Sequence, residues 1–127
     1  MDARGALSEL AELSAQIEAA AIVRGGTVEG ELGDPALVAR LVRAADELLG
    51  AAAGARPGGP EVERVEVVLP DGGVFVVRGE KRVAVAATVP EPTPGLVLYD
   101  LRTCLRRIDE EPAAAPKRRR RKTDADA

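Results

Sequence analysis

Histidine and tryptophan are absent from this 127-residue sequence, cysteine occurs once, as Cys104, and aromatic residues make up only 2%. Without histidine, the chain cannot form the Ser-His or Cys-His pairs of nucleophilic enzymes, and it lacks the commonest zinc ligand. A single cysteine excludes an internal disulfide and a cysteine-cluster metal site. We therefore expect a protein that is not an enzyme, with no catalytic residue, no metal site and no cofactor.

Long apolar runs are missing as well. No stretch approaches the roughly 18 consecutive apolar residues of a membrane-spanning helix. The N-terminal letters MDARGALSEL contain no apolar run of signal-peptide length. From these absences we expect no membrane insertion and a location in the reducing environment of the cytoplasm.

Charge and apolar content divide the chain into two parts. Residues 1–108 hold 12 Lys and Arg against 16 Asp and Glu, whereas residues 109–127 hold six against five. Hydrophobic residues make up 46% of the whole chain, which is enough for one core, but residues 109–127 have almost nothing to bury. We therefore expect one folded domain over residues 1–108 and a disordered, charged tail over residues 109–127.

Three segments place apolar residues at helical spacing. The first, residues 6–18, carries a narrow stripe made of Leu7, Leu10, Leu13, Ser14 and Ile17. The second starts at Asp34-Pro35, an acceptor side chain at the N-cap followed by proline at the first helical position, and runs to about residue 53. Thr93-Pro94 repeats this start. Residues 94–108 are therefore predicted to be a helix, although the letters LVLY within them are typical of a strand.

Five segments have the composition of strands. They are residues 19–24 and 27–32, joined by the turn Gly25-Gly26, and residues 62–69, 74–78 and 82–89. The last two are apolar on both faces, so both faces of the sheet need a cover. The predicted fold class is α+β, in the order helix-strand-strand-helix-strand-strand-strand-helix. Helices are expected on both faces, unless a partner supplies one of the covers.

This order of elements resembles the roadblock / dynein light chain family over about residues 6–108. The Gly25-Gly26 hairpin, the helix that opens with Asp34-Pro35, and the closing GGVFVVRGEKRVAVAATV followed by PGLVLYDLRTCLRRI carry the resemblance. It implies a profilin/roadblock-like, five-stranded antiparallel sheet, with the two terminal helices on one face and the middle helix on the other.

The resemblance also implies a function. Family members are usually homodimers in which the middle helices and central strands of both subunits meet. In bacteria and archaea they often serve as regulators or platforms for small Ras-like GTPases, and in eukaryotes as dynein subunits or lysosomal scaffold components. The gliding-motility members activate their GTPase by dimer contact without donating an arginine. No catalytic residues carry over to this chain.

The apolar stripe of the middle helix is wider than one sheet contact needs, which agrees with a homodimer. An uncovered apolar surface of that size is usually an interface. The predicted dimer interface consists of apolar residues of the middle helix and two valines of the third strand: Leu37, Val38, Leu41, Val42, Ala45, Leu48, Leu49, Val65 and Val67.

Charged residues of the middle helix fall mainly outside that stripe. By analogy with the family, the predicted contact with a small GTPase consists of Arg40, Arg43, Asp46 and Glu47. The alternative is an ordinary solvated helix face.

Cys104 lies among three arginines, and a thiol beside cations can be a reactive nucleophile. On a helix, however, Cys104 falls on the same side as Leu101 and Ile108, whereas Arg102 and Arg106 point about 160° away from it. Cys104 also lies in the C-terminal half, where the helix dipole raises a thiol pKa. We therefore interpret Cys104 as a buried, unreactive residue.

The tail contains six consecutive cations, Lys117, Arg118, Arg119, Arg120, Arg121 and Lys122. They could contact a polyanion, such as a nucleic acid, an anionic surface or an acidic partner, or they could simply aid solubility. No aromatic residue lies among them to stack on bases. Two alternatives to a GTPase regulator follow. One is a dimeric scaffold or adaptor subunit of a larger assembly, and the other is a polyanion or nucleic-acid binder that acts through the tail.

Overall fold

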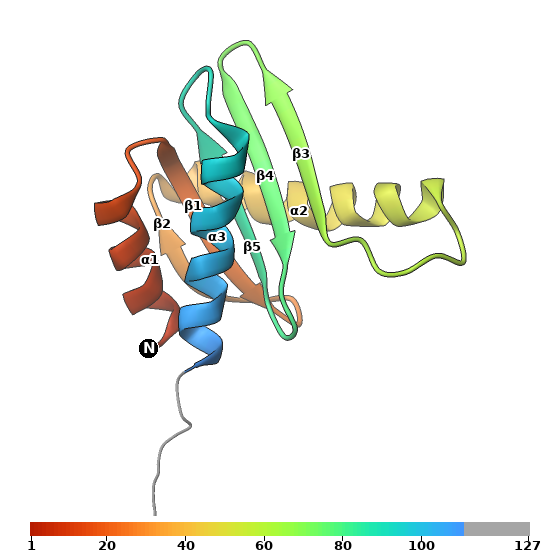
Figure 1. Cartoon of the computed structure of the whole chain (residues 1–127), viewed down its shortest axis with the longest axis horizontal. Coiled ribbons are helices and arrows are strands. Elements are labelled where there is room, and N and C mark those ends of the chain that lie inside the picture. Colours follow the sequence, from red (N-terminus) through yellow and green to blue (C-terminus); the bar gives the residue numbers. More distant parts are fainter. Residues whose placement is uncertain (111–127) are drawn as a thin grey trace, which may run out of the picture.

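The computed structural model describes residues 1–110 and contains eight elements in the expected order (Figure 1). The helices are α1 (Ala3–Leu13), α2 (Pro35–Ala55) and α3 (Pro94–Asp109). The strands are β1 (Ile17–Arg24), β2 (Thr27–Leu32), β3 (Arg64–Leu69), β4 (Gly72–Arg78) and β5 (Val83–Thr88), whose ends differ from the predicted ones by at most two residues. Residues 111–127 lie outside the described part of the chain, so the disorder of the tail stays a prediction.

The five strands form one sheet in the order β2-β1-β5-β4-β3, and every neighbouring pair is antiparallel. The expected five-stranded antiparallel sheet is therefore confirmed. Alanines fill its centre, where Ala20 of β1 lies opposite Ala86 of β5 and Ala19 lies opposite Ala87. Because these side chains are short, helices can pack close to the middle of the sheet. The edge strands are β2 and β3.

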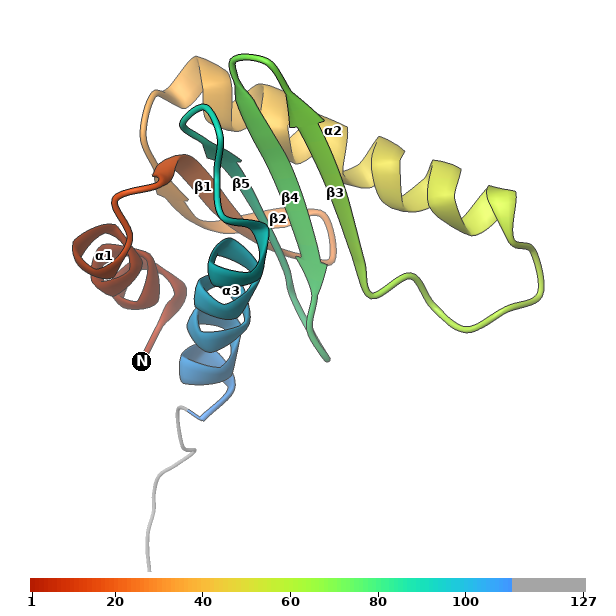
Figure 2. The same ribbon diagram turned by 45° about the horizontal axis from the view of Figure 1, so that its top comes forward.

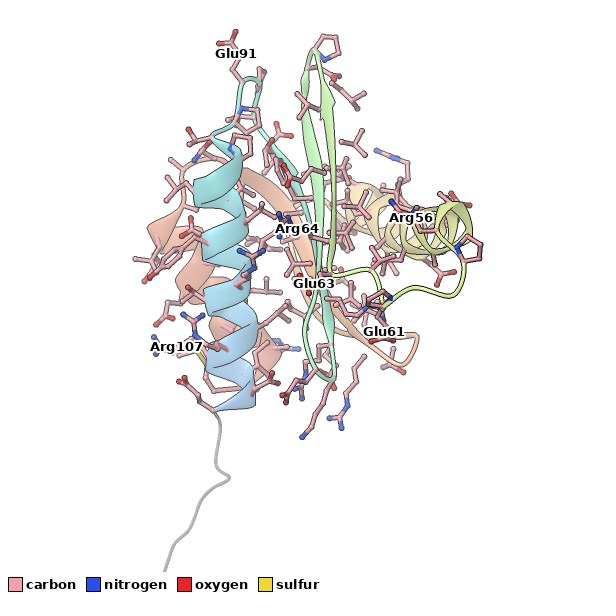
Figure 3. All side chains as sticks on the ribbon, turned by 45° about the vertical axis from the view of Figure 1, so that its right-hand side comes forward. Arg56, Glu61, Glu63, Arg64, Glu91 and Arg107 are labelled. Carbon is pink, nitrogen blue, oxygen red and sulfur yellow. The ribbon has the colours of Figure 1, made fainter. Side chains whose placement is uncertain are left out.

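Helices cover both faces of the sheet, as expected. α1 and α3 lie side by side on one face and α2 crosses the other (Figures 1 and 2). A view along the sheet shows it between α3 and α2 (Figure 3). Phe75 and Val76 are neighbours on β4, so they point to opposite faces. Phe75 is fully buried with Leu101 under α1 and α3, and Val76 is fully buried with Val85 under α2.

The first helix lies earlier in the chain than predicted. α1 starts at Ala3 because Asp2 caps it, the carboxylate accepting a hydrogen bond of 2.8 Å from the amide of Gly5. Ile17, which its spacing places on the helical stripe, is instead the first residue of β1 and pairs with Thr88. The prediction of a helix over residues 6–18 is therefore wrong at both ends, because pairing with β5 extends the strand back to Ile17.

The middle helix begins where the sequence predicts. The Asp34 carboxylate accepts a hydrogen bond of 3.0 Å from the amide of Leu37, and Pro35 is the first helical residue. The C-terminal turns of α2 project beyond β3, at the edge of the sheet (Figures 1 and 2). Near the end of α2, a Cβ atom at Gly50 or Gly54 would have no neighbour within 4 Å. The last turns of α2 therefore extend past the sheet on which the rest of the helix packs (Figures 1 and 2).

The last helix confirms the prediction of helix over strand, with one correction at its start. Pro94 is the first helical residue, but the Thr93 side chain makes no capping hydrogen bond, so the predicted cap is wrong. The Thr93 amide instead donates a hydrogen bond of 2.6 Å to the side-chain oxygen of Gln16. This contact joins the start of α3 to the segment between α1 and β1.

Arg82 holds the other end of α3 against the sheet. Its Nε lies 2.6 Å from Glu29 of β2, and its Nη1 lies 3.0 Å from Asp109, the last residue of α3. The Arg82 side chain is only 14% exposed, so its charge depends on these two carboxylates for compensation. Asp109, the last residue of α3, is therefore tied to the sheet through Arg82.

Candidate functional site

The four charged residues predicted to contact a GTPase are all exposed on α2. They lie on the part of the helix that faces away from the sheet: Arg40, Arg43, Asp46 and Glu47. Only Arg43 and Asp46 also border a hollow in the surface, whereas Arg40 and Glu47 do not. The structure thus divides this set into two residues beside a groove and two on the crest of the helix.

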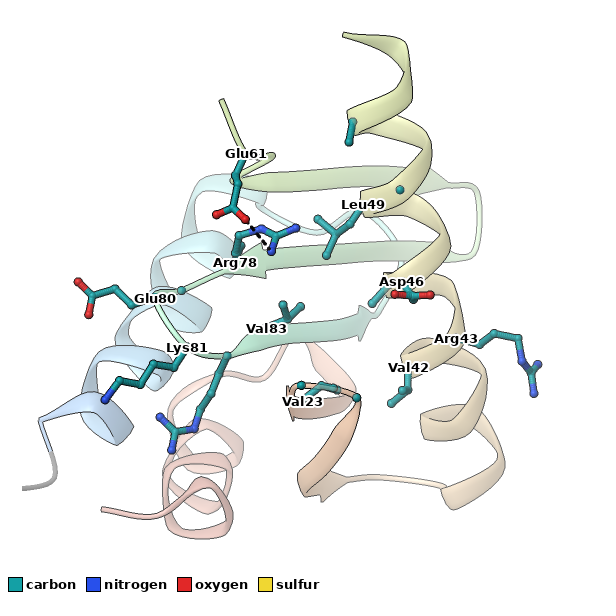
Figure 4. Close-up of a pocket in the computed structure, with 17 residues that line it drawn as sticks. Val23, Val42, Arg43, Asp46, Leu49, Glu61, Arg78, Glu80, Lys81 and Val83 are labelled. Carbon is teal, nitrogen blue, oxygen red and sulfur yellow. Dashed lines mark ion pairs between the residues drawn. The ribbon is translucent and has the colours of Figure 1, made fainter. Parts of the chain in front are cut away.

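The groove has a volume of about 740 Å³ and runs between α2, the β1–β2 turn and the β4–β5 turn (Figure 4). Its floor is apolar and includes Val23, Val42, Leu49 and Val83. Charged residues form the rim. In Figure 4 the side chain of Arg43 points away from the floor, so the groove has an apolar base with charges at its margin.

One end of the groove is closed by the segment that leads into β3. The Arg78 side chain lies 3.7 Å from the Glu61 carboxylate and donates a hydrogen bond of 2.9 Å to the carbonyl of Val62 (Figure 4). The Arg78 amide donates a further hydrogen bond of 2.8 Å to the carbonyl of Glu63. These contacts hold the segment against β4, which gives Arg78 a structural role at the groove.

The predicted dimer interface is divided by the packing of α2. Four of the predicted residues are only 2% to 9% exposed, because they pack on the sheet of this chain: Val38, Leu41, Ala45 and Leu49. The remaining predicted interface residues are only partly buried: Leu37, Val42, Leu48, Val65 and Val67. The apolar stripe of α2 therefore has a central row of side chains that is buried against the sheet. The side chains along its two edges stay partly exposed.

The border beside β3 continues onto that strand. Val65 and Val67 pair with Val76 and Val74, which lie on the face covered by α2. Leu69 continues the same alternation and is 47% exposed. We call Leu48, Val65, Val67 and Leu69 the β3-side apolar surface. The sequence prediction omitted Leu69, although the two-residue spacing from Val67 was visible in the sequence.

Cys104 is buried in the core between α1, α3 and the sheet, as predicted. Burial, and then the negative charge of Glu9 on α1, raise the pKa of the Cys104 thiol to about 11. A thiol with this pKa is protonated at neutral pH and is a poor nucleophile. The structure therefore supports the interpretation of Cys104 as an unreactive core residue.

Because Cys104 is the only thiol, its burial can be measured directly. At pH 8 in the native state, we expect it to react with a disulfide reagent at least about 100-fold more slowly than in denaturant, since reaction requires local or global opening. The folded pKa lies above the ordinary value of 9.0. The contribution of the thiol to stability is therefore complete below pH 9 and is lost as the pH rises toward 11. Equal rates with and without denaturant would contradict this placement.

Within residues 1–110, no group of three or more His, Cys, Asp or Glu side chains could hold a metal ion. None of the helices in this part of the chain is long and apolar enough to cross a membrane. The six cations of the tail, residues 117–122, lie outside the described residues, so their predicted contact with a polyanion stays a prediction.

Three solved structures share this arrangement of elements. A Roadblock/LC7 domain from Streptomyces avermitilis superimposes with a TM-score of 0.69, at 23% identity over 81% of this chain and 91% of its own. A second Roadblock/LC7 domain from the same organism gives 0.63, at 19% identity over 82% and 95%. MglB, in a tetrameric arrangement, gives 0.63, at 14% identity over 84% of each chain.

Comparisons of sequence add nothing to this likeness, because neither a protein-family model nor a curated protein matches the chain. The similarity is therefore one of structure, and it extends over nearly all of the described residues. It confirms at the level of the fold the resemblance that the order of elements had indicated. This chain has the Roadblock/LC7 fold.

Proposed function

We propose that the protein is a non-enzymatic, homodimeric regulator or platform for a small Ras-like GTPase in the bacterial cytoplasm. Two lines of argument support this proposal: the Roadblock/LC7 fold, and the resemblance to a family whose bacterial members regulate such GTPases. The single observation that carries it is the structural similarity to Roadblock/LC7 domains and MglB. The incomplete surface around β3 supports the homodimer in particular. There an edge strand, a projecting helix and exposed apolar side chains occur together.

A second copy would complete that surface. β3 has one unpaired edge, and pairing it antiparallel with the β3 of a second copy would extend the sheet across a two-fold axis. Each projecting α2 end would then lie over the sheet of the other subunit. The β3-side apolar surface would be covered in the same step, which supplies the hydrophobic contribution that a stable dimer needs.

The groove would stay accessible in such a dimer, because it lies on the other side of α2 from Leu48. At about 100° per residue, Arg43 lies roughly 140° from Leu48 around the helix, and Asp46 lies roughly 160° from it. We therefore propose these two residues, with Arg40 and Glu47 on the crest of the helix, as the contact with the GTPase.

Two measurements, made one after the other, test the proposal. Light scattering at micromolar concentration is expected to give twice the chain mass of 13.2 kDa, and a monomer that persists at tens of micromolar would overturn the dimer. GTP hydrolysis by the small GTPase encoded nearest to this protein is then measured with and without the dimer. A changed rate that the Arg43→Glu variant abolishes supports regulation through α2. No binding and no change in rate would overturn it.

A scaffold is the second candidate, and the tetrameric arrangement of MglB, which has the same fold, favours it. If the GTPase binds the dimer but hydrolyses GTP at an unchanged rate, the scaffold function is supported instead. The third candidate is a polyanion or nucleic-acid binder that acts through the tail. Deletion of residues 112–127 tests it, because salt-sensitive binding of a polyanion should then vanish while dimerisation persists. If polyanion binding is unchanged without the tail, binding through residues 117–122 is excluded.

A further inference from the structure

The outward surface of α1 and α3, on the other face of the sheet, exposes three large apolar side chains. Leu13 is 70% exposed, Leu96 is 50% exposed and Tyr99 is 60% exposed. On α3, Tyr99 points opposite to the buried stripe that contains Leu101 and Ile108, because it lies about 160° to 180° from them around the helix. None of the three contributes to the core of the subunit.

These side chains belong to one surface, because α1 and α3 lie side by side (Figures 1 and 2) and are joined at two places. At one place, the guanidinium group of Arg107, near the end of α3, lies 3.1 Å from the carboxylate of Glu9, inside α1. At the other, the Thr93 amide donates a hydrogen bond of 2.6 Å to Gln16. The end of α1, with Leu13, therefore lies beside the start of α3, with Leu96 and Tyr99.

The charges that project from α3 with Tyr99 are positive. Arg106 and Arg102 lie about 20° and 60° from Tyr99 around the helix, and both are exposed. Arg102 borders a hollow with Glu63 and Glu80, yet neither arginine forms an ion pair within residues 1–110. Arg106 also donates a hydrogen bond of 3.3 Å to the hydroxyl of Thr103, so neither exposed guanidinium group has a carboxylate partner in this part of the chain.

We propose that this outward surface of α1 and α3 binds an acidic amphipathic segment of a partner protein. Apolar side chains of the segment contact Leu13, Leu96 and Tyr99, and its carboxylates pair with Arg102 and Arg106. Tyrosine and arginine are the residue types that most often carry binding energy at protein interfaces. The two exposed arginines, which have no carboxylate partner within residues 1–110, supply the charge complementarity that selects an acidic partner.

Other occupants fit this surface less well. A second copy packed about a two-fold axis on α3 would bring arginines of both copies together, and like charges oppose such a contact. A nucleic acid would meet a domain of negative net charge and two leucines that cannot bind phosphate. The surface lies on the opposite face of the sheet from the β3-side apolar surface, so the inference does not depend on the proposed function.

Tyr99 provides the test, because it is the only tyrosine and the chain has no tryptophan. The probe is a helical peptide without aromatic residues that presents leucines on one face and glutamates on the other, titrated into the full chain. Tyr99 emission is expected to change saturably, with a dissociation constant on the order of 10 to 100 μM. A peptide with glutamine in place of glutamate, and polyglutamate of equal charge, are expected to bind at least about tenfold more weakly at Tyr99.

Paired variants locate the contact. The double variant Arg102→Glu/Arg106→Glu is expected to bind the acidic peptide at least about tenfold more weakly. Arg24→Glu/Arg56→Glu makes the same charge change at two exposed arginines outside α1 and α3 and is expected to leave the titration unchanged. Circular dichroism checks that both variants fold. The proposal is overturned if the acidic peptide has no saturable effect up to about 1 mM, if the two variants titrate alike, if polyglutamate is equally effective, or if only an oligonucleotide alters Tyr99 emission.

Discussion

Gly72→Ala is expected to lower the free energy of unfolding by about 3 kcal/mol or more, whereas Gly50→Ala should raise it by up to about 1 kcal/mol. Gly72 opens β4 with a φ of +147°, and a Cβ atom there would lie 2.3 Å from the carbonyl oxygen of Thr88. This oxygen belongs to the backbone of the neighbouring strand, so it cannot rotate away. Gly50 is exposed on α2, where a Cβ atom would have no neighbour within 4 Å.

Thermal and urea unfolding of the two variants measure this contrast. Both substitutions remove a glycine, so both reduce the entropy of the unfolded chain in the same way. The difference between them therefore reports on the folded structure at each position. We expect the melting temperature of Gly72→Ala to fall by about 10 °C or more. Equal melting temperatures for the two variants would contradict the close approach of β4 to Thr88.

Val67→Asp is expected to dissociate the proposed homodimer, because it should raise the dissociation constant of the dimer at least about 100-fold. In the subunit Val67 is only partly buried and does not belong to either core cluster, so aspartate there can remain hydrated while the subunit stays folded. In the dimer, the same carboxylate would be buried at the β3 junction without a partner.

Val68→Asp is the matched control for this experiment. Val68 is the next residue on β3, is 63% exposed and points to the opposite face of the sheet. Both variants introduce the same charge and the same low strand propensity. Light scattering over a range of concentrations should therefore show a monomer for Val67→Asp and a dimer for Val68→Asp. Equal masses for the two variants would exclude the β3-side apolar surface as the interface.

The parts of the fold that depend on neighbouring residues could be predicted from the sequence. The start of α2 at Pro35 depends on Asp34, the residue next to it, and it lies where the sequence placed it. The same holds for β2, whose hairpin turn and alternation predict its bounds as observed. The start of β1 could not be found in this way, because Ile17 fits a helical stripe and a strand equally well. Only its pairing with Thr88, far along the chain, decides between them.

The candidate site was predicted less completely for a similar reason. The sequence shows that one side of α2 is apolar from Leu37 to Leu49, but it does not show how the helix crosses the sheet. That crossing buries Leu41 and leaves Leu48 partly open. It also brings Arg43 to a groove whose other walls come from two distant turns. The residue types of the site were therefore predictable, whereas the division between core and surface was not.

The order of strands has a consequence for how the protein is made. β5, the last strand in the sequence, lies between β1 and β4 at the centre of the sheet. During synthesis the β1–β2 and β3–β4 hairpins can form as each emerges, but they cannot join until residues 83–88 have left the ribosome. Until then β1 and β4 each lack the strand that pairs with one of their edges. Pairing β1 with β5 also requires closing the long stretch of chain between them, which is slow. A nascent chain stalled before β5 would therefore expose the segments that chaperones bind.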